Sequence, residues 1–342
     1  MIVNFLKNLF GIIHYNNKID FFIYKKLRSY LPKNQYPRPP KSIAIDPCSV
    51  CNLSCPACVA CKSTPGFVSA KLSFDKFKLM LDKMPFARKL LLCNWGEPFL
   101  NDDIFKMIRY AKTKKLYVSL YSNLNIKKND CFYTELALSG LDDLLISIDG
   151  ITQENYEKFR AGGNLSLVFE NIKKINAAKE KKSSSLPKLY WHLTINKYNE
   201  KEITQAAAKA EELKMQFMPN YIILYHRVIP IDESEMAEKN SYWLPAKNKN
   251  YYHWQKNKPY RLDYPCQNLF LTVFFDPEGN CFPCRYLSDV KDSFGNILRE
   301  DFFDIWYGKK FLSARSLFLK NKTLPVNKAA TICDSCVMHK KY

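Results

Sequence analysis

Short apolar runs alternate with longer amphipathic segments along most of the chain. In the amphipathic segments an apolar residue recurs every three or four positions, whereas the short runs are almost continuously apolar. Strands are predicted at residues 43–46, 89–93, 116–120, 143–148, 189–195 and 218–225. Helices are predicted near residues 73–84, 102–113, 130–139, 166–181 and 199–214. This order is that of successive βα units, which build a parallel sheet covered by helices.

The number of these units limits the architecture. Six βα strands do not close an eight-stranded barrel, so we predict an α/β fold built on a partial (β/α)6 TIM-like barrel of parallel strands. Residues 269–275 have the pattern of a further strand, a turn follows at Asp276–Gly279, and the chain returns through residues 281–284. This predicts a small C-terminal unit made of a β-hairpin and a helix.

These patterns divide the chain into four parts. A basic amphipathic helical lead spans residues 1–41, and the barrel spans residues 42–225. A bridge rich in Tyr, Trp, Lys and Asn spans residues 226–264, and the C-terminal unit spans residues 265–342. We expect the lead to dock on the protein's own core, with peripheral contact to a membrane surface as the alternative. The bridge is expected to line the substrate side of the cavity.

Composition bounds the class of protein. The 342 residues are 47% hydrophobic, enough for a sizeable core, and no apolar stretch approaches the roughly 18–20 residues that cross a bilayer. Twelve cysteines without a secretory signal favour metal ligation in a reducing compartment, so a cytoplasmic protein is expected. The net charge of +19 favours acidic partners, but no RNA-binding signature or arginine-rich tract indicates nucleic acid.

Three cysteines lie close together after the first predicted strand. Cys51, Cys55 and Cys58 have the spacing C-x3-C-x2-C. Thiolates select iron–sulfur clusters, zinc or Cu(I), and a closed structural zinc site takes four ligands, whereas three ligands leave one iron of a cluster open for chemistry. Cys48 and Cys61 form C-x2-C pairs with members of the triad, which keeps a zinc knuckle as the alternative. Both flanking cysteines otherwise stay without a role.

The triad resembles the cluster loop of the radical SAM superfamily, in which S-adenosylmethionine (SAM) binds the fourth iron of a [4Fe-4S] cluster. The resemblance implies reductive cleavage of SAM to a 5′-deoxyadenosyl radical, which abstracts hydrogen from a bound substrate. The cofactors supply this chemistry. The resemblance also implies a small-molecule or peptide substrate and an electron donor such as flavodoxin or ferredoxin.

Polar residues follow each predicted strand, where the active site of a parallel barrel forms. Trp95-Gly96-Glu97-Pro98 follows the second strand and resembles the Gly-Gly-Glu motif of the family, with Trp95 in place of the first glycine. The resemblance implies that the backbone and carboxylate of Gly96 and Glu97 contact the amino group of SAM. Further SAM contacts are expected at Ser122, Asn123 and Ser147. A turn or a helix cap is the alternative role for each of these.

No general base is evident. Four candidates lie at or near predicted strand ends: Asp149, His192, Tyr225 and His226. A fifth candidate, Arg160, ends a Tyr-x3-Arg segment that resembles a recurrent segment of relatives, and it is suited to bidentate carboxylate binding. An ordinary core or surface role is the alternative for all five.

A second group of cysteines lies in the C-terminal third: Cys266, Cys281, Cys284, Cys333 and Cys336. The spacing Cys266-x12-Gly279-x4-Cys284 resembles the signature of SPASM and Twitch extensions, which bind auxiliary [4Fe-4S] clusters. The resemblance implies one auxiliary cluster held by every cysteine of this group except Cys281. A zinc ribbon is the alternative.

A fully ligated auxiliary cluster would accept or relay an electron from a substrate radical, which favours oxidation. We therefore expect a radical SAM oxidoreductase-like enzyme that dehydrogenates a small polar or carbohydrate-type substrate, as one-cluster dehydrogenases of the family do. Two alternatives stay open. One is maturation of a ribosomally synthesised peptide, and the other is a non-enzymatic iron–sulfur scaffold or redox protein.

Overall fold

The computed structural model describes residues 38–56, 58–61, 64–221, 243, 245, 266–318 and 328–336. Most of the predicted lead and bridge lies outside the described residues. So do the candidates Tyr225 and His226 and the side chain of Cys61.

A single nine-stranded sheet, in the order β6-β5-β4-β3-β2-β1-β7-β8-β9, organises the described chain. Its first six strands by sequence are parallel to their neighbours: β1 (Ser42–Ile45), β2 (Lys89–Leu92), β3 (Tyr117–Ser122), β4 (Asp143–Ser147), β5 (Lys188–Ile195) and β6 (Gln216–Tyr221). Each overlaps one predicted strand. The predicted partial barrel of parallel strands is therefore confirmed.

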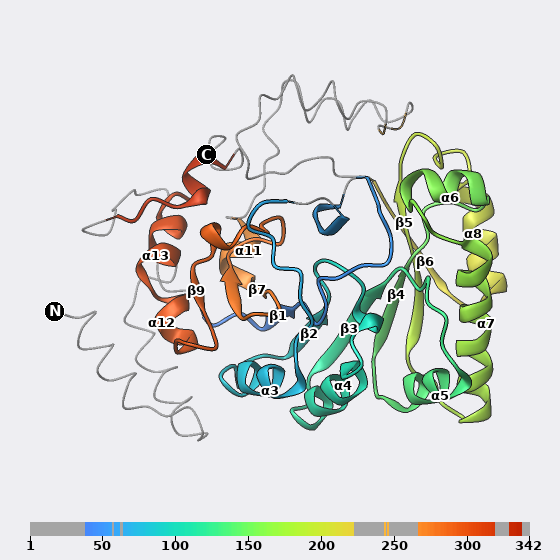
Figure 1. Ribbon diagram of the computed structural model, residues 1–342, viewed down its shortest axis with the longest axis horizontal. Coiled ribbons are helices and arrows are strands. Elements are labelled where there is room, and N and C mark those ends of the chain that lie inside the picture. The colour runs from blue at the N-terminus through green and yellow to red at the C-terminus, as the bar shows by residue number, and fades with distance from the viewer. Residues whose placement is uncertain are drawn as a thin grey trace.

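Helices follow the strands and cover the outer face of the curved sheet (Figure 1). They are α3 (Phe74–Asp82), α4 (Ile104–Thr113), α5 (Asp130–Leu138), α6 (Gln153–Phe159), α7 (Leu165–Lys181) and α8 (Ile203–Glu212). All but α6 coincide with predicted helices. The seven residues of α6 make only two turns, too few for a clear apolar period.

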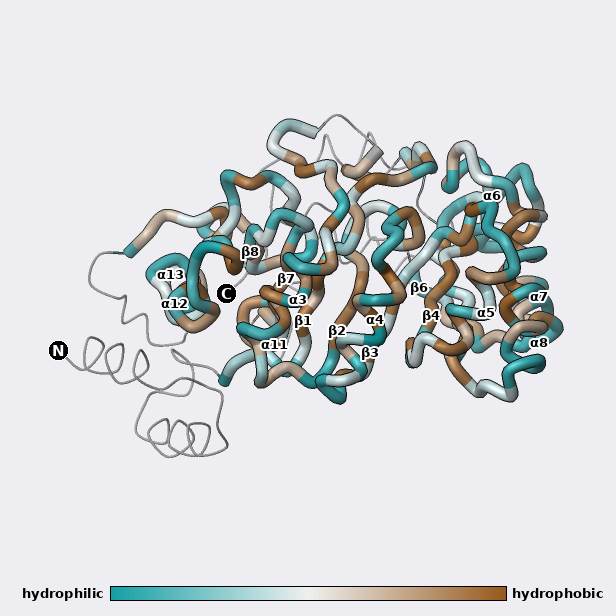
Figure 2. The backbone as a smooth tube through the Cα atoms, turned by 60° about the horizontal axis from the view of Figure 1, so that its bottom comes forward, coloured by the Kyte–Doolittle hydropathy of each residue, from teal (hydrophilic) through white to brown (hydrophobic). Residues whose placement is uncertain are grey.

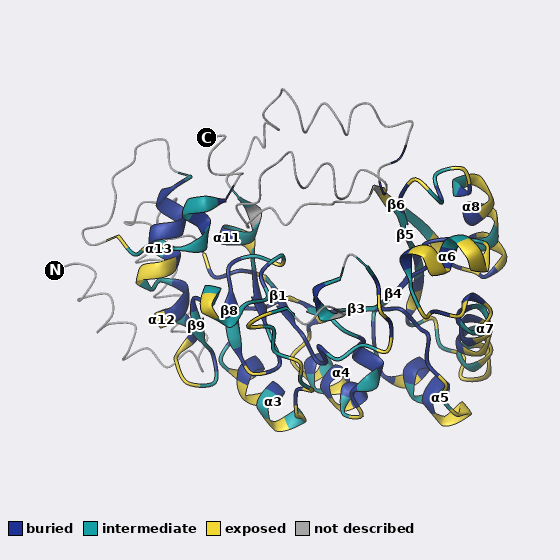
Figure 3. Ribbon diagram, turned by 45° about the horizontal axis from the view of Figure 1, so that its top comes forward, coloured by how far each residue is buried: buried dark blue, intermediate teal, exposed yellow. Residues whose placement is uncertain are grey.

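The strands separate a core face from an inner face. In β5 the residues Leu189, Trp191 and Leu193 are buried, and Trp191 contacts Phe169 of α7. The alternate residues of β5 are only partly buried and point to the inner face, because successive side chains of a strand alternate. Figure 2 shows strands that are largely hydrophobic, and Figure 3 shows exposed residues on the outer helices. The inner face is thus free to carry polar side chains.

The C-terminal unit continues the barrel sheet. Strand β7 (Thr272–Phe275) pairs parallel with β1, and β8 (Asn280–Phe282) and β9 (Gly295–Asn296) follow in antiparallel order. Gly279 adopts a φ of +80° in the turn between β7 and β8, as a tight hairpin turn requires. Helices α12 (Phe302–Trp306) and α13 (Lys309–Ser316) pack beside it. The predicted hairpin is therefore present, joined to the barrel by backbone hydrogen bonds.

The predicted strand at residues 269–275 is wrong in its first half. Residues Gln267–Leu271 form a short helix, α11, and the strand begins only at Thr272. The helical turn buries Leu269 and leaves Leu271 exposed. A short continuous apolar run does not distinguish a helix from a strand, and this one contains both.

None of the described helices combines the length and the apolar composition needed to span a membrane.

Candidate active site

The three cysteines of the triad lie in a loop that turns back on itself after β1. The Cys58 N–H donates to the Cys55 carbonyl oxygen (3.1 Å), which closes the turn. Cys55 is buried, and Cys51 and Cys58 are partly exposed. Burial raises the pKa of Cys51 to about 11 and also raises that of Cys55. The thiolate forms therefore need a bound cation, and the iron atoms of a cluster fit that requirement.

Two neighbouring segments hold this loop. The Ser54 N–H donates to the Ala161 carbonyl oxygen (2.9 Å), just after α6. The Glu97 N–H donates to the Val50 carbonyl oxygen (2.9 Å), just after β2. Cys48 is fully buried, with its Sγ 3.5 Å from the Val50 carbonyl oxygen, so it packs within the loop.

The segment after β2 packs directly on the backbone that precedes the triad. Gly96 has a φ of +70°, and a Cβ there would lie 2.2 Å from the Cys48 carbonyl oxygen and 2.7 Å from the Ser49 Cα. Only glycine fits such an approach. Trp95 takes the place of the first glycine, and its backbone N–H donates to the buried carboxylate of Asp46 (3.1 Å). Sequence analysis assigned no role to Asp46; an acid ending an apolar strand is the signal for it.

Glu97 fastens the segment after β2 to the end of β3. Its buried carboxylate accepts hydrogen bonds from three donors: Ser122 Oγ (2.8 Å), the Asn123 N–H (2.7 Å) and the Phe99 N–H (3.1 Å). Burial raises the pKa of Glu97 to about 7, and the three hydrogen bonds oppose that shift. Glu97 was predicted to contact SAM. Both of its carboxylate oxygens accept hydrogen bonds from the protein itself.

Replacing Glu97 with glutamine should destabilise the holoprotein by about 1–3 kcal/mol, because the amide group would place a donor against the donor of Asn123. Thermal unfolding of the anaerobically prepared protein measures this. The exposed Glu211→Gln variant is the matched control and should unfold like the wild type. Equal unfolding midpoints for the two variants would show that the Glu97 hydrogen bonds do not hold the strand ends.

The other predicted SAM contacts lie close to the triad or on the inner face. Asn123 Nδ2 is 3.6 Å from Cys51 Sγ and donates to Asn52 Oδ1 (3.1 Å). Ser147 ends β4, in register with His192 of β5. The structure therefore brings Asn123 to the triad, holds Ser122 against Glu97, and places Ser147 at the end of β4.

Asp149 and Arg160 form a buried ion pair beside the triad. Arg160 Nε donates to Asp149 Oδ2 (2.5 Å), and the Thr194 N–H donates to Asp149 Oδ1 (2.5 Å). The positive charge of Arg160 also opposes the rise in the pKa of Cys55 that burial causes. Asp149 is therefore committed to holding Arg160 and is poorly placed to act as a general base.

Among the described candidates, His192 is the one that forms no ion pair of this kind. It lies on the inner face of β5, and its ring centroid is 5.5 Å from that of Tyr121 on β3, edge to face. Tyr121 was not predicted as a site residue. The signal is its inner-face position near the end of β3, which becomes visible only once the strand register is known.

Four of the five C-terminal cysteines lie within electrostatic reach of one another: Cys266, Cys284, Cys333 and Cys336. Burial raises the pKa of Cys333, and the charges of the other three raise it further. Cys281 is instead buried in the core near Glu300 and Arg315. Among the described residues, no three His, Cys, Asp or Glu side chains converge closely enough to hold one metal ion. The four thiols are thus neighbours rather than a closed single-ion site.

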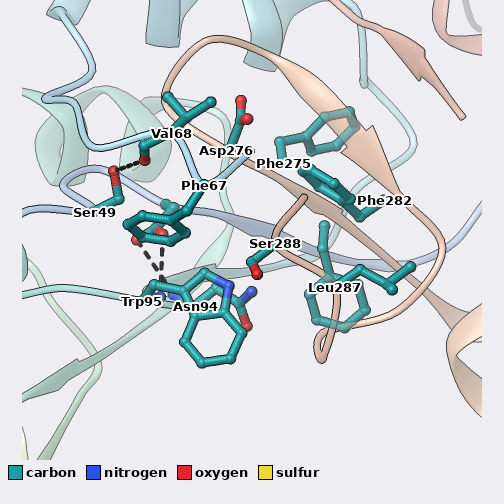
Figure 4. A pocket seen from close by; sticks show the side chains of 12 residues that line it. Ser49, Phe67, Val68, Asn94, Trp95, Phe275, Asp276, Phe282, Leu287 and Ser288 are labelled. Atoms are coloured by element: carbon teal, nitrogen blue, oxygen red, sulfur yellow. Dashed lines mark hydrogen bonds between the residues drawn. The ribbon is translucent and has the colours of Figure 1, made fainter. Parts of the chain in front are cut away.

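A small pocket lies where the barrel meets the hairpin (Figure 4). Asn94 and Trp95, after β2, form one side of it, and Phe282 and Leu287 form the other. Asn94 Nδ2 donates to the Arg285 carbonyl oxygen (3.1 Å), which fixes the chain just after Cys284. The two cysteine groups therefore belong to segments that touch each other.

Comparison with known proteins finds a matching domain and proteins of similar fold. Residues 266–337 match the SPASM iron–sulfur cluster-binding domain. The AdoMet-dependent heme synthase of Methanosarcina barkeri is 24% identical over 78% of this chain and 82% of its own. Streptococcus suis SuiB bound to SAM has a similar fold (TM-score 0.65, 16% identity, 99% of this chain and 80% of that one). So does anSMEcpe with bound AdoMet (TM-score 0.56, 14% identity, 82% and 84%).

These findings confirm the family that the two cysteine patterns predict. The chain is an enzyme rather than a non-enzymatic scaffold, and its cofactors are SAM and [4Fe-4S] clusters. The chain is a radical SAM enzyme with a C-terminal SPASM-type iron–sulfur domain.

Proposed function

We propose that the enzyme oxidises its substrate and passes one electron to an auxiliary cluster held by Cys266, Cys284, Cys333 and Cys336. The gathering of these four thiols, with Cys281 turned into the core, is the observation that carries the proposal. Four protein ligands leave no iron open to substrate, so electron transfer is the role that fits best. When bound, the cofactors supply hydrogen-atom abstraction and this electron acceptor.

We assign the triad Cys51, Cys55 and Cys58 to the SAM-binding cluster. Gly96, Ser122, Asn123 and Ser147 are assigned to the SAM site on their positions around that loop. The Glu97 carboxylate supports the site by holding Ser122 and Asn123. The proposed core spans residues 42–225 and the auxiliary domain spans residues 265–342.

The proposed substrate is a small polar or carbohydrate-type molecule with a hydroxyl group at the reacting carbon. Its C–H hydrogen leaves as an atom, its O–H hydrogen leaves as a proton, and the remaining electron goes to the auxiliary cluster, so that a carbonyl forms. The half-buried Ser119, Tyr121, His192 and Thr194 support this class because they give the inner face hydroxyl and imidazole groups.

Peptide maturation is the second candidate. SuiB has been solved with its precursor peptide SuiA (TM-score 0.63, 15% identity), and anSMEcpe with the Cp18Cys peptide (TM-score 0.50, 16% identity). The likeness is one of fold, which in those proteins accommodates a peptide. Deuterium transfer into 5′-deoxyadenosine from a labelled peptide, and not from labelled sugars, would favour this candidate.

The net charge of +19 supports an acidic electron donor such as a flavodoxin or ferredoxin. We also place the enzyme in the cytoplasm, where cysteine thiols stay reduced.

A pair of cysteine variants tests the auxiliary cluster. Cys284→Ala should lower the iron content from about eight to about four per chain while 5′-deoxyadenosine still forms on reduction. Cys281→Ala should keep about eight irons, since its side chain packs in the core. Iron and sulfide analysis after anaerobic reconstitution gives the result. A loss of four irons in the Cys281 variant, or of none in the Cys284 variant, would overturn the ligand set.

A further inference from the structure

The inner face of the sheet carries an imidazole and a phenol next to each other. Tyr121 of β3 and His192 of β5 lie on the face turned away from the helices, with their ring centroids 5.5 Å apart. The side of this face near the hairpin is apolar, since Ala44, Phe274 and Phe282 cluster there. In the described part of the sheet, the polar part of this face therefore lies on β3 to β6, away from the hairpin.

His192 presents a nitrogen that is ready to accept a proton. Its Nδ1 atom is buried and has no hydrogen-bond partner in the described part of the chain. Leaving such an atom unpaired is costly, and a bound ligand removes the cost. Burial lowers the pKa of His192; the charge of Asp149 opposes that shift, and the charges of Arg160 and Arg285 add to it. The ring is therefore neutral near pH 7, the form that takes up a proton.

Arg285 brings a positive charge to the same region from the C-terminal hairpin. Its carbonyl oxygen is held by Asn94 Nδ2 (3.1 Å), and its side chain is exposed. Among the described arginines, Arg109 and Arg160 form ion pairs with acidic side chains, and Arg285 does not. The positive charge of Arg285 opposes the rise in the pKa of Tyr121 that burial causes. It also helps to lower the pKa of His192.

We propose that the substrate is a small anionic alcohol, whose carboxylate or phosphate group binds Arg285 and whose hydroxyl proton passes to Nδ1 of His192. A guanidinium group binds such oxyanions through paired hydrogen bonds. Tyr121 positions the imidazole through the edge-to-face ring contact. This inference rests on the proposed oxidation. In that reaction the alcohol loses one hydrogen atom, one proton and one electron to form the carbonyl, and His192 accepts the proton.

The first experiment tests the anion site on the anaerobic holoprotein with SAM. The probes are D-glucose 6-phosphate, D-gluconate and glycerol 3-phosphate, each compared with its neutral parent, glucose or glycerol. At least one anionic probe should raise the Tm more than its parent, because a ligand stabilises the folded state that binds it. Arg285→Gln should abolish the difference, and the exposed Arg299→Gln variant should retain it. No difference in the wild type, or an equal one in Arg285→Gln, overturns the assignment.

The second experiment tests His192 with the same probes fully deuterated at carbon. The wild type should place deuterium in 5′-deoxyadenosine and form a carbonyl product. His192→Ala should keep the deuterium transfer within about threefold but lower carbonyl formation by about 10²–10⁴-fold, the usual worth of a general base. Added imidazole should restore part of the loss.

The outcomes separate this inference from the proposed function. Equal carbonyl formation by His192→Ala and wild type overturns the role of His192. No deuterium transfer from any probe in the wild type overturns the anionic alcohol as the substrate class. The auxiliary cluster of the proposed function is judged independently by the iron content and SAM cleavage of the Cys284→Ala variant.

Discussion

Replacing Cys51, Cys55 and Cys58 together with alanine should abolish the formation of 5′-deoxyadenosine from SAM on reduction with dithionite. The three replaced thiols are the assigned ligands of the SAM-binding cluster, and Cys48 Sγ lies against the Val50 carbonyl oxygen instead. About four irons should remain, because the C-terminal thiols belong to a separate segment. The measurement combines iron analysis with chromatographic detection of 5′-deoxyadenosine.

The exposed Cys131 of α5 gives the control for this experiment. Cys131→Ala also removes a thiol but should keep about eight irons and full SAM cleavage. Wild-type cleavage by the triple variant would show that the catalytic cluster lies elsewhere. Loss of all iron from the triple variant would mean that the two sites do not assemble independently.

Arg160→Met should destabilise the protein by about 3–5 kcal/mol, the usual cost of leaving one partner of a buried ion pair without the other. The Asp149 carboxylate is fully buried and the Arg160 side chain is 18% exposed, so water screens the pair little. The same change removes a positive charge that lowers the pKa of Cys55. The triad should therefore also lose iron more readily. Thermal unfolding and iron retention after gel filtration measure the two effects.

An exposed arginine provides the comparison. Arg109 lies 3.8 Å from Glu135 with both side chains about half exposed, so Arg109→Met should cost less than about 1 kcal/mol. In the double variant Arg160→Met with Asp149→Asn, part of the loss should be recovered, since no uncompensated charge is then buried. Equal unfolding midpoints for Arg160→Met and Arg109→Met would contradict the structural role of the pair.

The order of elements could be predicted from the sequence because each barrel strand is a short apolar run between amphipathic helices. The prediction was wrong at residues 269–275, where α11 and β7 share one apolar run. Nothing in that run marks the change, since the burial of Leu269 depends on helices that follow it in the chain. The pairing of β7 with β1 could not be predicted either, because it joins segments far apart in the sequence.

The family could be predicted because its cysteines recur at fixed spacings. The hydrogen bonds that Glu97 accepts could not be predicted, since they depend on donors that β3 brings to it through strand pairing. The same reason explains why Tyr121 was missed beside His192. Contacts between residues on different strands depend on the strand register, so they can be identified only once the structure of the sheet is known.

The pairing of β7 with β1 bears on how the protein is made. Residues Ser42–Ile45 of β1 pair with Thr272–Phe275 of β7, so β1 gains this neighbour only after the other barrel strands have been synthesised. Until then β1 offers an open edge to other chains, a recognised starting point for aggregation. Production of the protein should therefore benefit from slow synthesis at low temperature and from chaperones that shield strand edges.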